Sequence, residues 1–154
     1  MVDSRKKGAR AELAARDLLR KYTGHRWERT PGSGALGVQH KLKGDLYIPN
    51  HQNEFLIEVK HYKIDQMGSI VLTHKEPTLF GWWDKAERQA DETDKIPIVL
   101  YKWDRSKWYI IVPTDLVNTG GKLRNIRFKT EYNNHGSIFA AEDWLIESKG
   151  KVTW

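Results

Sequence analysis

The segment KGDLYIPNHQNEFLIEVK, residues 43–60, predicts two short β-strands joined by a turn. Pro49 and Asn50 supply the turn, because proline fixes one backbone angle and asparagine tolerates tight turns. The turn folds the first strand back antiparallel to the second and places Asp45 alongside Glu58. We therefore expect a pair of carboxylates at the centre of the fold.

The second strand has two chemically different faces. Side chains alternate between the faces of a strand, so Glu58 and Lys60 point the same way. The opposite face is apolar and consists of Phe55, Ile57 and Val59. Two carboxylates and one ammonium group are therefore expected to share one small site. A surface hairpin with solvated charges is the alternative.

This predicted site favours a hard divalent cation. Two neighbouring carboxylates raise each other's pKa unless positive charge lies between them. The chain has no cysteine, and its six histidines show no ligand spacing, so oxygen ligands favour Mg²⁺ over zinc, with Mn²⁺ as a substitute. Such ions commonly act on phosphates.

The composition is typical of a globular protein, and we expect one domain over residues 1–154. Hydrophobic residues make up 39% of the chain and charged residues 30%. No apolar run approaches the roughly 20 residues that span a bilayer, and the amino terminus is charged where a signal peptide is apolar. These features predict a cytoplasmic location and no membrane partner.

The positive charge is concentrated at the front of the chain. Residues 1–43 contain 11 basic and 4 acidic side chains, a charge of +7, whereas the remainder contains 15 and 16, a charge of −1. A basic region beside an acidic strand pair is typical of a protein that binds a polyanion and uses a metal to react with it. A merely basic, soluble protein is the alternative.

Helical spacing of apolar residues near the amino terminus predicts a helix over residues 4–21. The apolar stripe consists of Ala11, Ala14, Ala15, Leu18, Leu19 and Tyr22. Glu12 lies at the margin of this stripe, where it reaches over the edge of the core or pairs with Arg16 one turn later. The start of the helix is basic, and its dipole also favours anions.

Residues 25–29 are compatible with a short strand, and residues 30–37, TPGSGALG, with a loop. The small residues of this loop let the backbone approach a ligand closely. Arg29 and Ser33 offer a guanidinium and a hydroxyl that suit phosphate. A flexible linker is the alternative.

A second amphipathic helix is predicted over residues 78–93, after a segment, residues 61–75, without periodicity. Its apolar stripe consists of Leu79, Trp82, Trp83, Ala86 and Ala90. Lys85 and Gln89 lie on the same helix and face either the carboxylates or solvent. Residues 96–103 and 107–113 predict two interior strands joined by a tight turn, because apolar residues occupy both faces.

The last part of the chain gives weaker patterns. Residues 114–117 predict the start of a short helix, and residues 122–132 an edge strand or a nucleic-acid contact, with the edge strand ranked first. Residues 137–147 are either helical or extended, and Ala140, Ala141, Trp144 and Leu145 favour the helix.

The order of these pieces resembles the PD-(D/E)XK nuclease superfamily, and more narrowly the archaeal-type Holliday junction resolvases. The matching pieces are Lys7-Gly8 with Glu12, Arg29 to Ala35 (RTPGSGA), Gly44-Asp45, and Glu58-Val59-Lys60. The resemblance covers about residues 4–113, the expected nuclease core, and leaves residues 114–154 as a carboxyl-terminal extension. Gly44 stands where the superfamily's name has proline.

The resemblance implies an α/β fold of the restriction-endonuclease type, with a central mixed sheet flanked by helices. It implies that Asp45, Glu58 and the Val59 carbonyl hold Mg²⁺, and that Glu12 completes the site directly or through water. Lys60 would orient or deprotonate the attacking water and stabilise charge on the phosphate. The expected contacts to the DNA backbone are Arg5, Lys6, Lys7, Arg10, Arg29 and Ser33.

The implied function is a Mg²⁺-dependent DNA endonuclease, specifically a Holliday junction resolvase in DNA recombination and repair. Symmetric cleavage of a four-way junction needs two active sites and predicts a homodimer, with aromatic side chains around Trp82 as candidates for its interface. One alternative is a restriction-like or repair nuclease for duplex, flaps or ends. Another is a nucleic-acid-binding protein without catalysis, although such a protein gains nothing from acids that face a polyanion.

Overall fold

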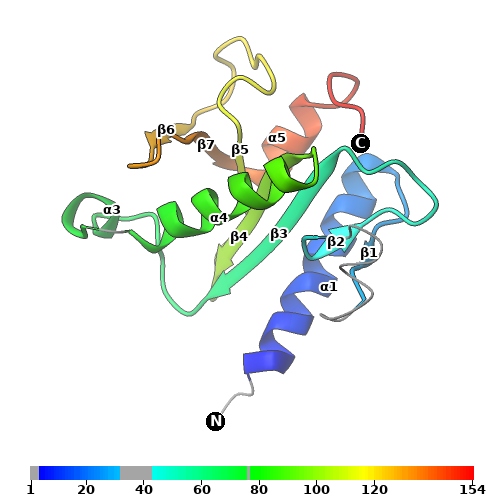
Figure 1. The fold of residues 1–154 in the computed structure, drawn as a ribbon, viewed down its shortest axis with the longest axis horizontal. Helices are drawn as coiled ribbons and strands as arrows, with labels where there is room; N and C mark the ends of the chain where they lie inside the picture. Colours follow the sequence, from blue (N-terminus) through cyan, green and yellow to red (C-terminus); the bar gives the residue numbers. More distant parts are fainter. Residues whose placement is uncertain (1–3, 32–42, 76) are drawn as a thin grey trace.

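The computed structural model of the chain describes residues 4–31, 43–75 and 77–154. These residues form one seven-stranded mixed sheet with the order β1-β2-β3-β4-β5-β7-β6 (Figure 1). The strands are β1 (Glu28–Arg29), β2 (Leu46–Tyr47), β3 (Phe55–Tyr62), β4 (Ile96–Trp103), β5 (Tyr109–Val112), β6 (Ile126–Lys129) and β7 (His135–Ala140). The helices are α1 (Ser4–Thr23), α3 (Ile70–Thr73), α4 (Thr78–Glu92) and α5 (Ala141–Glu147). The predicted α/β class with a central mixed sheet and flanking helices is confirmed.

Helices cover both faces of the sheet. On one face, Leu19 of α1 and Trp144 of α5 share a buried core with Ile57 of β3. On the other, Trp83 and Ala86 of α4 pack in a second core against β4 and β5. Figure 1 shows α4 lying across β3 and β4. The sheet is therefore the middle of three layers.

Strand β3 shows the predicted alternation. Phe55 and Ile57 belong to the core on the α1 side, and Val59 packs against it. Tyr62 packs against the core on the α4 side. Because Glu58 and Lys60 have the same parity as Tyr62, they point from β3 towards the α4 side of the sheet.

The two long helices begin where the apolar spacing predicts. In α1, Ala11, Ala15, Leu18 and Leu19 of the predicted stripe are buried, Tyr22 is half-buried and Ala14 is exposed, so the predicted stripe is one residue too wide. In α4 all five predicted apolar residues are buried. Trp82 is only 8% exposed and Trp83 is fully buried, so neither of these two is an exposed aromatic side chain, and a dimer interface around Trp82 stays a prediction. None of the helices in the described ranges is long and apolar enough to cross a bilayer.

Strands β3 and β4 run parallel and are connected through α4, because parallel neighbours need a crossover. The described residues 63–75 and 77 belong to the connection before α4 and include the four-residue helix α3. Strands β4 and β5 are antiparallel and largely buried, which confirms the two predicted interior strands.

The carboxyl-terminal region differs in part from the sequence prediction. Residues 114–117 form a turn, so the predicted helix there is wrong. Residues 126–129 form β6 at the edge of the sheet, as predicted. Residues 137–147 are divided between β7, which pairs with β5, and α5, which begins at Ala141.

Candidate active site

Asp45 and Glu58 meet on neighbouring strands. β2 and β3 pair antiparallel at Leu46 and Ile57, which sets Asp45 opposite Glu58. The Asp45 N–H donates to the Ile57 carbonyl at 2.7 Å, and Oδ2 of Asp45 accepts from the Val59 N–H at 2.7 Å. The backbone of β3 therefore fixes both the position and the orientation of the Asp45 carboxylate.

The environment of Glu58 disfavours its negative charge. Burial, followed by the neighbouring Asp45 carboxylate, raises the pKa of Glu58 to about 7. The positive charges of Lys60 and Lys85 lower this pKa. A pair of acids in this state is stabilised by an added cation, and strongly shifted acids of this kind are common at functional sites.

The donor set fits a divalent cation that binds together with phosphate. Among the described residues, no three Asp, Glu, His or Cys side chains gather in a way that could hold a metal ion. Within the described part of the chain, the carboxylates that face each other at this position are those of Asp45 and Glu58. Mg²⁺ commonly takes one or two carboxylates and completes its coordination with water and substrate phosphates.

Gly44 has a backbone conformation that proline cannot adopt. Its φ is +89°, and a Cβ at this position would lie 2.9 Å from the Ile57 carbonyl oxygen and 3.2 Å from the Ile57 nitrogen. Proline requires a φ near −65°. Gly44 therefore stands in place of the proline of the superfamily's name because the backbone before Asp45 has a conformation that proline cannot adopt.

Gly44→Ala is expected to reduce the free energy of unfolding by about 2 kcal/mol or more. The alanine would have to adopt a left-handed backbone conformation, and its Cβ would overlap the Ile57 backbone. The measurement is urea unfolding followed by circular dichroism. Gly8→Ala is the control, since Gly8 lies in α1 with no atom within 4 Å of an added Cβ, and this change should be neutral or stabilising. Equal stability of the Gly44→Ala variant and the wild type would contradict the geometry.

Glu12 forms an ion pair with Arg29. The Arg29 Nε donates to Oε2 of Glu12 at 2.7 Å, whereas Arg16 pairs with Asp17, so the alternative Glu12–Arg16 pair is not formed. Arg29 of β1 lies opposite Leu46 of β2, so β2 separates Arg29 from β3. The ion pair thus connects α1 to the strand pair that carries Asp45. The direct part of Glu12 in a metal site stays a prediction.

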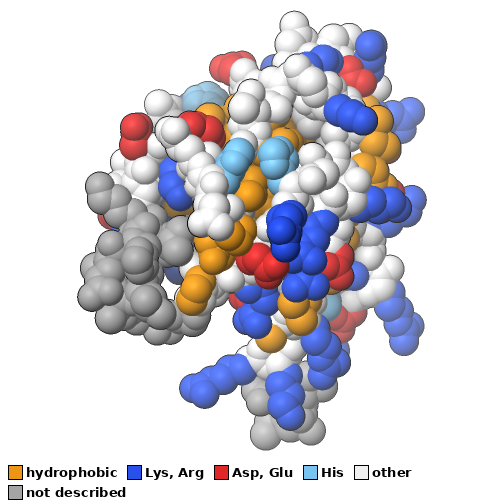
Figure 2. Space-filling view, turned by 90° about the vertical axis from the view of Figure 1, so that its right-hand side faces the viewer, with side chains coloured by type: hydrophobic (Ala, Val, Ile, Leu, Met, Phe, Trp, Pro, Cys, Tyr) orange, Lys and Arg blue, Asp and Glu red, His pale blue; other side chains and the backbone are white. Residues whose placement is uncertain are grey.

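The basic amino-terminal side chains lie along the start of α1. Lys7 Nζ lies 3.1 Å from the carboxylate of Asp104, which also lies 2.8 Å from Nε2 of His61. Lys6 and Arg10 are exposed, and Ser33 lies outside the described residues. Figure 2 shows Lys and Arg side chains gathered around a few acidic ones on this face of the molecule.

Two groups of ion-pair contacts around the candidate site are not predicted by any pattern in the sequence. Asp104 lies in the β4–β5 turn and brings Lys7 and His61 together from distant parts of the chain. Lys43, just before the acid pair, makes an ion pair with Glu92 at the end of α4. Charged residues of this kind look like solvated surface until the fold brings them together.

The match to a family of known proteins makes this chain a nuclease of the PD-(D/E)XK class. Over residues 3–143 the chain matches the family described as "Phage putative PDDEXK endonuclease", and it belongs to this family. The superfamily predicted from the sequence is thereby confirmed. Nucleases of this class generally use divalent metal ions.

Two similar proteins place the chain among known ones. Protein D14 of Escherichia phage T5 is 45% identical over 112 residues, which cover 71% of this chain and 70% of that protein. The solved structure of Archaeoglobus fulgidus Hjc, a Holliday junction resolvase from an archaeal hyperthermophile, has 18% identity and a TM-score of 0.47, with 96% of this chain and 99% of that one covered. This second likeness is too distant to transfer a substrate.

Proposed function

We propose that this protein is a Mg²⁺-dependent endonuclease that hydrolyses phosphodiester bonds in DNA, with the four-way Holliday junction as its substrate. The observation that carries the proposal is the pair of Asp45 and Glu58, whose shared charge is disfavoured without a cation, beside Lys60. The family match supports nuclease chemistry. The order of motifs that resembles the archaeal-type resolvases supports a branched substrate.

In the proposed reaction, Asp45 and Glu58 hold the cation, and Mn²⁺ can replace Mg²⁺. When bound, such an ion polarises the phosphate and lowers the pKa of a bound water. The Val59 N–H keeps the Asp45 carboxylate in position through its hydrogen bond. Lys60, on the same side of β3 as Glu58, stabilises the negative charge that builds on the phosphate.

The proposed DNA-binding surface is the basic start of α1 with the neighbouring β1 edge. Its described members are Arg5, Lys6, Lys7, Arg10 and Arg29, and Ser33, which lies outside the described residues, is the further DNA contact proposed from the sequence. Lysine and arginine bind the DNA backbone through charge and release its counterions, so this surface provides affinity without sequence preference. Glu12 holds the Arg29 guanidinium beside β1 and would orient it towards DNA.

A resolvase must cut two opposing strands, and we propose that it does so as a homodimer with one active site in each chain. Two basic surfaces held at a fixed angle contact several arms of a junction at once, whereas a straight duplex satisfies only part of them. A nuclease for duplex, flaps or ends uses the same acid pair without this requirement. The shape of the preferred DNA distinguishes the two functions.

The test compares a synthetic four-way junction with linear duplex of the same sequence. Glu58→Gln protein is expected to bind the junction at least about tenfold more tightly, or about 1.4 kcal/mol. Wild-type protein with Mg²⁺ is expected to nick opposing strands in symmetric positions near the branch point and to be inactive in EDTA. A monomer that binds and cuts both DNAs equally would contradict the resolvase proposal and leave the nuclease intact.

A further inference from the structure

Helix α4 lies directly over the part of β3 that carries the acid pair. Near one end of the helix, the Trp82 and Tyr62 ring centroids are 4.9 Å apart, and Trp82 Nε1 donates to the Tyr62 hydroxyl at 3.3 Å. Just past the other end, the Ile96 N–H donates to the Glu54 carbonyl at 2.9 Å. The segment from Trp82 to Ile96 therefore runs along β3 from residue 62 to residue 54, and α4 passes over the part of β3 that contains Glu58.

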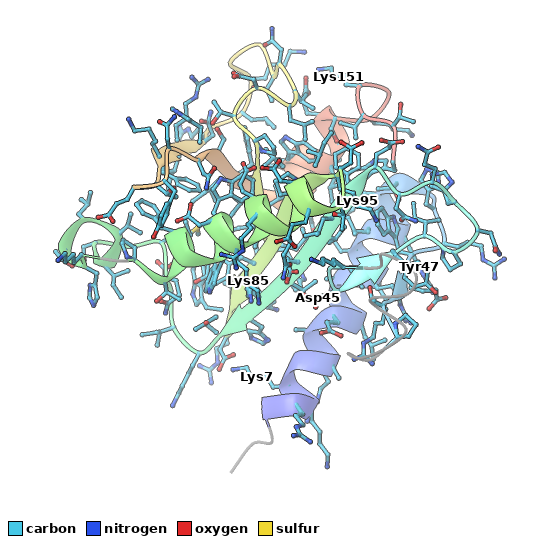
Figure 3. The ribbon with its side chains drawn as sticks, viewed as in Figure 1. Lys7, Asp45, Tyr47, Lys85, Lys95 and Lys151 are labelled. Atoms are coloured by element: carbon cyan, nitrogen blue, oxygen red, sulfur yellow. The ribbon has the colours of Figure 1, made fainter. Side chains whose placement is uncertain are left out.

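The side chains of α4 nearest to this position are Lys85 and Gln89. Together with Glu92 they form one stripe, because residues three or four apart share a face of a helix. Lys85 comes one helical turn after Trp82, about 4.5 Å further along α4, so it lies over β3 between Tyr62 and Glu58. Lys85 is also one of the charges that act on Glu58. In Figure 3, Lys85 extends from α4 over the region of β3.

The residues of this stripe differ in their interactions. The one at the end of α4 forms an ion pair, whereas the other two form none with any residue that the structure describes. Glu92 makes an ion pair with Lys43. Gln89 Oε1 is buried and has no hydrogen-bond partner among the described residues. Lys85 is exposed and, within the same part of the chain, makes no hydrogen bond or ion pair. Lys85 and Gln89, on the α4 side of the sheet to which Glu58 points, thus have no hydrogen-bond or ion-pair partner for the Lys85 ammonium and the Gln89 Oε1 among the described residues.

We propose that Lys85 is a phosphate-binding residue of the active site, which reaches from α4 to the DNA phosphate held at Asp45 and Glu58. This inference rests on the proposed function. A phosphate at this site has the sheet below it and α4 beside it, so Lys60 approaches from the strand and Lys85 from the helix. The flexible stem of lysine suits a group that closes on a ligand as it binds.

The variant Lys85→Ala is compared with Arg88→Ala, which removes the same charge from an exposed position of the same helix. With Mg²⁺ and saturating junction DNA, Lys85→Ala is expected to lower the single-turnover rate by about 30-fold or more, since positioned charges on a reacting phosphate have effects of this order. Lys85→Arg should restore the rate to within about fivefold of wild type. Arg88→Ala should stay within about twofold.

Binding provides a second readout without metal or cleavage. In Glu58→Gln protein in EDTA, Lys85→Ala is expected to reduce the slope of log affinity against log salt by about 0.9, the loss of one phosphate contact, and Arg88→Ala to leave it unchanged. Equal rates for Lys85→Ala and Arg88→Ala, or an unchanged slope in Lys85→Ala, would overturn the inference while the nuclease stands. A wild type without metal-dependent cleavage would reject the proposed function, and this inference with it.

Discussion

Glu58→Gln protein is expected to bind DNA as tightly as wild type and to cleave it roughly 10²–10³-fold more slowly, or not at all. The change keeps the size of the side chain but removes the charge that holds a cation beside Asp45. Asp45→Asn should have the same effect, even though an amide oxygen can still accept the Val59 N–H. The measurement is single-turnover cleavage with Mg²⁺ and with EDTA.

Glu54→Gln is the matched control, because Glu54 is exposed, precedes β3 and has the same parity as Glu58. It loses the same charge and should cleave at the wild-type rate. Full activity of both Glu58→Gln and Asp45→Asn would reject the assignment of the site. Loss of activity in all three variants would indicate a general effect of charge.

The dependence of stability on pH shows whether Glu58→Gln is folded and tests the environment of Glu58 at the same time. The folded protein holds the Glu58 proton up to a pKa of about 7, against the usual value of 4.5. Between these values the folded state binds more protons than the unfolded state, so the free energy of unfolding of metal-free wild type falls as pH rises. The free energy of unfolding of the Glu58→Gln variant should not fall in this way as pH rises. It should match wild type near pH 4 and exceed it at pH 8 by up to about 3 kcal/mol, measured by urea unfolding. Parallel pH profiles would contradict the raised pKa.

Lys60→Ala is expected to reduce the rate at saturating DNA by roughly 10²–10³-fold and to change the affinity for DNA only slightly. The reason is that a positioned ammonium group acts mainly on the charge that develops during the reaction. Lys63→Ala, which removes an exposed lysine just past the end of β3, is the control and should leave the rate unchanged. A Lys60→Ala variant that binds weakly but reacts at the normal rate would make Lys60 a simple phosphate contact.

The parts of the fold that the sequence predicted are those set by local periodicity. Phe55, Ile57 and Val59 alternate with Glu58 and Lys60 because β3 lies between helices on both faces, although Leu56, on the face of Glu58, is also buried. The stripe of α4 was complete for the same reason, since each of its large side chains is buried. The pairing of Asp45 with Glu58 was predicted, but its register is set by the Leu46–Ile57 pair across a connection of residues 48–54, since a two-residue turn at Pro49 and Asn50 would place Asp45 opposite Glu54.

The parts that the sequence did not predict depend on distant neighbours. Ala140, Ala141, Trp144 and Leu145 have helical spacing, but residues 137–140 are extended because they pair with β5. The partner of Glu12 was missed because Arg29 is 17 positions away and reaches it only when β1 joins the sheet. The orientation of Lys85 was left open for a similar reason, because the contacts at both ends of α4 decide it.

Gly44 has a consequence for how relatives of this protein are recognised. A search pattern that requires proline before the aspartate tests the identity of that residue, whereas this chain requires a particular backbone conformation at that position. A left-handed φ together with the nearby Ile57 backbone leaves glycine as the residue that fits. In chains whose backbone follows the same path into this strand, the two acids and the lysine are the residues to compare. The residue before the aspartate depends only on the backbone conformation there.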